Sequence, residues 1–153
     1  GASPETFHAD GSVVAGPPIV EARPDGIGYL GVGIGTWEPT GPRSGHATFV
    51  QVLGDADGAY TGTLTIDAHL AVSEDGQTFV DDDPTTTITI RDATNAVVLV
   101  IEPYAPGGAG MPPVTAIRMT PGSPGFPEPA DGSATPAAAV SESRWRPHLV
   151  ATV

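Results

Sequence analysis

The stretch from Tyr29 to Leu53 constrains the fold most, because it combines a predicted hairpin with glycine at every second position. Two runs of β-favouring residues flank Gly41-Pro42-Arg43, which is the pattern of an antiparallel hairpin. Gly31, Gly33 and Gly35 leave one face of the first arm without side chains. Such a strand loses stability unless the sheet needs the space or the bend. A tightly curled sheet needs both, so we interpret this hairpin as the wall of a small closed β-barrel, with Trp37 plugging one end.

Repeated Asp-Gly pairs extend this pattern along the chain. Asp-Gly between alternating apolar runs is a strong signal for a hairpin turn, so the sequence predicts a meander of antiparallel strands. The pairs begin at residues 10, 25, 57, 75 and 131. The predicted strands cover residues 12–20, 28–39, 44–54, 60–73, 77–92, 96–103 and 113–120. No window has an apolar period of 3.6 residues, so we expect little or no helix.

Side-chain alternation predicts which face of each strand looks inward. In the strand 60–73, Tyr60, Leu64 and Ile66 share the inward face, and threonines alternate with them. The strand 77–92 is interrupted at Asp81-Asp82-Asp83-Pro84, where a proline and three carboxylates predict a bulge or an edge kink.

The end of the chain predicts how the barrel closes. Residues 121–143 have the Pro, Ala, Gly and Ser composition of a linker, and residues 144–153 read as a strand. We expect this strand to lie beside residues 6–15, which gives eight strands in a single domain spanning residues 1–153. A natural closing strand and a circular permutation, with the opening GASPE as a cloning remnant, both explain this arrangement.

Composition excludes several chemistries. The 153 residues include no cysteine, so disulfides, thiolate metal sites and cysteine nucleophiles are absent. All six basic residues are arginine, which excludes a Schiff-base lysine and a lysine-dependent phosphate loop. The net charge of −12 repels phosphate backbones and anionic lipids, so we expect neither nucleic acid nor a membrane as a partner. The sequence has no membrane helix and no leader of basic and then apolar residues, so we expect a soluble protein. Its compartment stays open, with export after removal of a leader as an alternative.

Several segments together resemble the lipocalin-like barrels, or calycins, and more closely a group of small bacterial proteins related to allene oxide cyclase. The resemblance covers residues 6–120 and is carried by TFHADGSVV, GIGTWEPTGPR, ATFVQVLGDADGAYTGTLTI, EDGQTF and VTAIRM. It implies an all-β, eight-stranded, antiparallel up-and-down barrel whose cup binds a small, largely apolar molecule. Some members of this group are cyclases. In calycins the tryptophan of Gly-x-Trp packs under an arginine from a late strand, which implies a structural pair of Trp37 and Arg118.

The predicted binding residues are apolar or aromatic side chains with a few polar ends along the strands. They are Tyr29, Trp37, Phe49, Gln51, Tyr60, Leu64, Ile66 and Tyr104, and Glu38 and Glu102 lie at further strand ends. The sequence assigns no catalytic residue. Four histidines, at positions 8, 46, 69 and 148, have no metal-ligand spacing, so no metal and no cofactor is expected.

Two classes of function remain open. A cup of this kind binds a small hydrophobic molecule, and in a cofactor-free cyclase or isomerase it folds an oxylipin-like or polyketide-like substrate into a reactive conformer. The alternative is a stable, catalytically silent barrel that serves as a scaffold. Assembly of a homodimer through the outer threonine-rich faces is a further alternative.

Overall fold

The computed structural model of the chain describes residues 3–23 and 26–123. Contacts within the chain define two compact units, Gly1–Pro121 and Gly122–Val153. The predicted strand 144–153 and all but the start of the predicted linker 121–143 lie outside the described residues. The predicted approach of this strand to residues 6–15 therefore stays a prediction.

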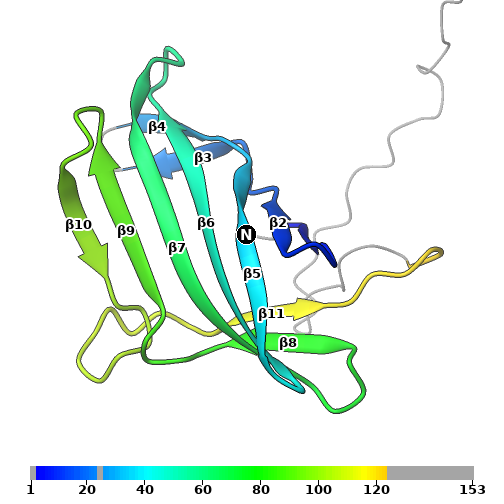
Figure 1. The fold of residues 1–153 in the computed structure, drawn as a ribbon. Helices are drawn as coiled ribbons and strands as arrows, with labels where there is room; N and C mark the ends of the chain where they lie inside the picture. Colours follow the sequence, from blue (N-terminus) through cyan, green and yellow to red (C-terminus); the bar gives the residue numbers. More distant parts are fainter. Residues whose placement is uncertain (1–2, 24–25, 124–153) are drawn as a thin grey trace, which may run out of the picture. The chain divides into compact units, whose positions relative to one another are not determined.

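The first unit is a single antiparallel sheet of eleven strands, strongly curled into a half-barrel (Figure 1). The described residues contain no helix, as the sequence predicts. The strands are β1 (Glu5–Phe7), β2 (Ser12–Ala15), β3 (Val20–Arg23), β4 (Gly26–Leu30), β5 (Gly33–Gly41), β6 (Ser44–Gly54), β7 (Tyr60–Val72), β8 (Thr78–Asp81), β9 (Thr87–Asp92), β10 (Val97–Ile101) and β11 (Val114–Ile117). The predicted all-β, antiparallel class is confirmed.

The two longest strands, β6 and β7, form the central hairpin. Their ladder runs from the pair Ser44 and Ala71 to the pair Gly54 and Tyr60. The turn between them is closed by Asp55, whose Oδ1 accepts hydrogen bonds from the backbone N–H groups of Asp57 and Ala59 at 3.0 and 2.9 Å. Gly58 supplies the positive φ of 79° that this Asp-Gly turn needs.

The sheet branches on both sides of this hairpin (Figure 1). Next to β6, β5 pairs along the first part of the strand and continues to β2 and β1, whereas β4 pairs at its end and continues to β3. Next to β7, β9 pairs along the first part of the strand and continues to β10, whereas β8 pairs at its end and continues to β11. Because four branches leave one hairpin, the sheet wraps around the space that its inner face encloses.

Three predicted strands are broken where the branches diverge. The range 12–20 stops as β2 at Ala15, and Val20 begins β3. The range 28–39 divides into β4 and β5 between Leu30 and Gly33, so that each part pairs with a different stretch of β6. The range 77–92 divides into β8 and β9 across Asp82 to Thr86, which includes the predicted interruption. Breaks of this kind allow one strongly curled sheet to turn its corners.

Cross-strand register separates an inner face from an outer face. The inner face carries Val13 and Ala15 of β2, Phe49 of β6 and Ile66 of β7, and its centre is the buried cluster of Val13, Ala15 and Phe49. The outer face carries threonines of β7 and β9, which alternate with the inner residues as the sequence predicts. This face also exposes several large apolar side chains, namely Val14, Ile34, Val50 and Val52.

The glycines of β5 are explained by the packing on the inner face. A Cβ at Gly33 would lie 2.9 Å from the ring of Phe49 and 3.1 Å from the Cβ of Ala15. A Cβ at Gly35 would overlap the backbone oxygen of Thr48 and lie 2.5 Å from the Cα of Phe49. Phe49 and the backbone of β6 therefore occupy the space that side chains at these two positions of β5 would need.

Within the described residues, no helix is long and apolar enough to cross a membrane.

Candidate functional site

Five of the predicted binding residues lie on the inner face, and four of them face one another in the β6–β7 ladder. Phe49 pairs with Ile66 and Gln51 pairs with Leu64 in the β6–β7 ladder, so these side chains project from the same side of the sheet. In β9, Ile88 pairs with Ile66 and Ile90 with Leu64, which extends the apolar surface by one strand. Phe49 is buried, whereas the aliphatic side chains of β7 and β9 are only partly buried.

Gln51 is the unusual residue of this surface. It is 5% exposed, yet its amide makes no hydrogen bond within the described residues. No side-chain nitrogen or oxygen described is both fully buried and unpaired, so the amide reaches the accessible space on the inner face. Because this amide reaches accessible space, water can supply its hydrogen bonds in the free protein. A polar group of this kind can instead fix the orientation of a bound molecule.

Trp37 lies on the inner face, on the part of β5 that pairs with the start of β6. Its indole packs edge-on against Phe7, with ring centroids 5.7 Å apart, and its Nε1–H donates a 2.7 Å hydrogen bond to the backbone oxygen of His8. Its ring contact within the described residues is therefore with Phe7 rather than with the guanidinium of Arg118. Arg118 follows β11, is exposed, and donates its backbone N–H to the oxygen of Gln77 at 2.7 Å.

Tyr29 and Tyr60 lie apart from the inner-face residues. They line an open hollow of about 240 Å³ near the β6–β7 turn, beside Val52 of the outer face. Tyr60 pairs with Gly54, and the register shifts between this pair and the pair of Leu53 and Gly62. Because of this bulge, the inward position that the alternation of residues 60–73 predicts for Tyr60 is wrong, and the side chain is 52% exposed.

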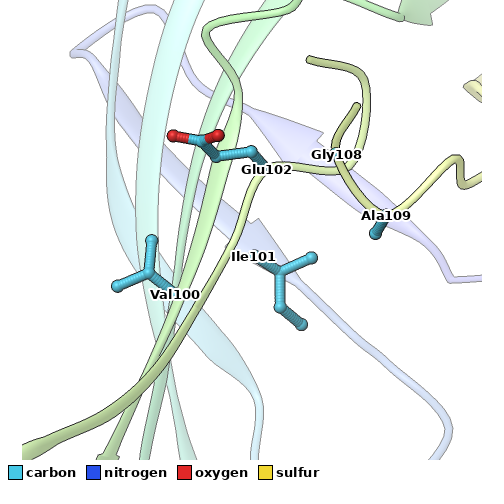
Figure 2. A pocket seen from close by; sticks show the side chains of 5 residues that line it. All are labelled: Val100, Ile101, Glu102, Gly108 and Ala109. Carbon is cyan, nitrogen blue, oxygen red and sulfur yellow. The ribbon is translucent and has the colours of Figure 1, made fainter. Parts of the chain in front are cut away.

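A second open hollow, of about 380 Å³, lies where the chain folds back after β10. Figure 2 shows Ile101 on the side of the strand that Gly108 and Ala109 approach, while Val100 and Glu102 point to the other side. The loop is held by the N–H of Ala109, which donates to the oxygen of Glu102 at 3.1 Å. Sequence reasoning placed Glu102 at a strand end but gave no signal for this hollow, because a chain reversal over residues 102–111 forms it.

Two carboxyl groups from distant parts of the chain, those of Glu5 and Asp81, lie close enough to interact. Glu5 of β1 is half-buried and Asp81 at the end of β8 is 4% exposed. Burial, and then the charge of Asp81, raises the pKa of Glu5 above its usual 4.5. Burial likewise raises the pKa of Asp81, although the hydroxyl of Thr86 donates a 2.7 Å hydrogen bond to its Oδ1. Burial, and then Asp81, also raises the pKa of Tyr104, the eighth predicted binding residue.

The outer face holds a second group of ionisable side chains, on β6 and β7. The Nε2 of His46 lies 2.5 Å from the Oδ1 of Asp67, which also accepts a 2.7 Å hydrogen bond from the hydroxyl of Thr48. The ring of His69 stacks on His46, with centroids 4.4 Å apart and an angle of 5° between the planes. Partial burial acts to raise the pKa of Asp67, but the Thr48 and His46 hydrogen bonds and the charges of His46 and His69 together lower it.

The structure therefore divides the predicted binding residues among three places. Trp37, Phe49, Gln51, Leu64 and Ile66 share the inner face, Tyr29 and Tyr60 share an open hollow, and Tyr104 lies in the loop after β10 near Asp81. Glu5 and Asp81 were missed, because nothing in the sequence pairs residues so far apart. The stacked histidines were missed because their spacing along the chain conceals their pairing across the hairpin.

Comparisons with known proteins give no relative for this arrangement. No family model matches the chain, and searches of curated proteins and of solved structures find no match. The structure supports a curled antiparallel sheet that is compatible with a barrel.

Proposed function

We propose that the chain binds a small, largely apolar molecule on the inner face of its curled sheet. The observation that carries this proposal is Gln51, a nearly buried residue on an aromatic and aliphatic surface, whose amide has no hydrogen-bond partner in the described residues and reaches accessible space. A ligand carbonyl or hydroxyl placed against this amide would supply the missing hydrogen bond. The apolar remainder of such a ligand would cover the surface next to it.

The aliphatic side chains around Gln51 support the same proposal. Leu64 and Ile66 of β7, and Ile88 and Ile90 of β9, stay partly accessible on the inner face. Covering apolar surface contributes about 25 cal/mol per Å². A ligand that covers these four side chains would gain most of its binding free energy from them, and Gln51 would supply direction.

The carboxyl pair supports a chemical role for the same face. A carboxyl group that holds its proton in an apolar setting can donate a hydrogen bond to a substrate carbonyl. Asp81 and Glu5 are the described groups whose environment favours this form. We therefore propose cofactor-free cyclisation or isomerisation of an oxylipin-like or polyketide-like substrate, as in the allene oxide cyclase-like barrels that the sequence resembles.

A neutral apolar dye tests binding without interference from the acidic surface. We expect N-phenyl-1-naphthylamine to gain fluorescence on the wild-type protein and to bind more weakly to Leu64→Gln. Val50→Gln is the matched control, because it makes the same change of polarity on the outer face. Val50 is 41% exposed there. Circular dichroism confirms that both variants keep the sheet. Equal binding by both variants would contradict an inner-face site.

The second candidate is a catalytically silent scaffold. It is favoured by the two hollows, which are open and lie beside the β6–β7 turn and behind β10 rather than at Gln51. Native mass spectrometry of protein purified from its own host distinguishes the two candidates. A copurified small molecule supports binding, whereas bare protein together with no dye binding supports the scaffold.

A further inference from the structure

Three groups that can ligate metal meet on the outer face, where β6 and β7 run side by side. They are His46, Asp67 and His69, and one ligand atom from each lies within 4.8 Å of the others. The side chains of His46 and Asp67 are 34% and 40% exposed, so solvent and small ions reach them. The pairing of His46 with His69 in the β6–β7 ladder fixes this arrangement at the level of the backbone.

We propose that His46, Asp67 and His69 form a binding site for a divalent transition-metal ion of the zinc class. Two imidazole nitrogens and one carboxylate oxygen are ligands that zinc takes at about 2.0–2.2 Å. The three atoms already lie within 4.8 Å of one another, so rotation of the partly buried imidazoles about their side-chain bonds would bring them to a common centre. The site lies on the face opposite the proposed apolar ligand, so the two proposals stand independently.

The surroundings of the three residues favour a cation. The hydroxyl of Thr48 donates a 2.7 Å hydrogen bond to the Oδ1 of Asp67, as a supporting group does in many metal sites. The carboxylate of Asp83 lies close enough to interact with His69. The net charge of −12 further raises the local concentration of cations.

The position of the site also indicates what the ion would do. The backbone ladder already joins β6 to β7 on both sides of these residues, so the ion is not needed to hold the strands together. Three protein ligands leave a fourth position of a tetrahedral ion to water. The ion would therefore be open to solvent, as in a site that binds or activates a water molecule.

Isothermal titration of the EDTA-treated full chain with zinc chloride tests the site. We expect one ion to bind the wild-type protein, and affinity to fall at least about tenfold in both His46→Ala and His69→Ala. The matched control is the double variant His8→Ala/His148→Ala, which removes the two histidines outside the site and should bind as the wild type does. Absence of binding to the wild type, or equal affinity in His69→Ala, would overturn the proposal.

A second measurement tests the site in the wild-type protein, so that it does not depend on the folding of any variant. In ¹H–¹⁵N spectra of the wild-type protein, we expect zinc to shift the backbone resonances of residues 46, 67 and 69 and those of their ladder neighbours. Shifts confined to other parts of the chain would overturn the assignment even if one ion binds.

Discussion

The ring of Phe7 on β1 packs edge-on against the ring of Phe79 on β8, with centroids 6.1 Å apart and planes at 89°. In the described ladders β1 pairs with β2, whereas β8 pairs with β7 and β11. The two branches therefore meet through side chains, and no described backbone ladder joins them. The contact lies at the end of the sheet where Trp37 also packs against Phe7.

Removing the ring of Phe79 should loosen β1. We expect Phe79→Ala to lower the free energy of unfolding by about 2 kcal/mol, less than for a fully buried phenylalanine. Hydrogen exchange at Glu5–Phe7 should accelerate more than exchange in β6. Val80→Ala is the control, because Val80 is the next residue of β8 and its side chain projects from the face opposite to Phe79. Val80 pairs with Ala71 of β7. Unchanged exchange in β1 would show that this contact does not hold the branch in place.

Gly35 should not tolerate a side chain. We expect Gly35→Ala to destabilise the protein by about 2–3 kcal/mol, because its Cβ would overlap the backbone of Thr48 and Phe49. Thr36→Ala, on the exposed outer face of the same strand, should change stability by less than about 0.5 kcal/mol. Urea denaturation measures both variants. A neutral Gly35→Ala would mean that β5 and β6 are farther apart than described.

The raised pKa of Glu5 predicts a gain in stability from Glu5→Gln at neutral pH. Below the usual pKa of 4.5 the carboxyl is protonated in both the folded and the unfolded chain, so the variant should match the wild type. As the pH rises through the raised folded pKa, only the wild type incurs the cost of charging Glu5 beside Asp81. The variant should therefore be the more stable at pH 7.

Urea denaturation at about pH 4 and at pH 7 checks this difference. Glu74→Gln, an exposed residue between β7 and β8, is the control for the change in net charge. A variant less stable than the wild type at pH 7 would show that the carboxylate of Glu5 has a stabilising partner.

The lowered pKa of Asp67 predicts the opposite pH dependence. Its contribution is present above the usual 3.8 and is lost as the pH falls through the lower folded pKa. We expect Asp67→Asn to cost about 1 kcal/mol at pH 7, since the hydrogen bonds from Thr48 and His46 are partly screened by solvent. The difference should vanish in strong acid. Thermal unfolding in EDTA, with exposed Asp57→Asn as control, measures it without bound metal.

Gln51→Met should stabilise the free protein and weaken its binding of the apolar dye. Gln51 is only 5% exposed and its amide has no partner within the described residues, so replacing the amide by an apolar chain of similar length should gain up to about 1 kcal/mol. Urea denaturation and dye titration are made on the same samples. A loss of stability would indicate that the amide makes a hydrogen bond in the free protein and would remove the main support for the proposed function.

Local signals made the class of the fold predictable. Asp57-Gly58 and Asp75-Gly76 lie in turns where both glycines have positive φ, and Gly41-Pro42-Arg43 joins β5 to β6. Turn chemistry of this kind acts over a few residues, so it can be recognised in one sequence. The break between Leu30 and Gly33 had no such signal, because it depends on which stretch of β6 each part pairs with.

The site was less predictable because register decides it. The shift at Leu53 and Gly54 places His46 opposite His69, and a slip of one residue would place Ala68 there instead. The inward position of Leu64 and Ile66 follows from alternation alone and was predicted. The proximity of Glu5 and Asp81 requires the whole sheet to curl, which no local pattern specifies.

The β6–β7 hairpin has a consequence for the order of folding. Its ladder joins residues separated by a turn of only a few positions, whereas β1 meets β8 only after most of the chain is in place. Chain closure over short distances costs less entropy, so this hairpin should form early and act as the nucleus on which the four branches assemble. Substitutions in its ladder should slow refolding, while those at Phe7 or Phe79 should mainly accelerate unfolding.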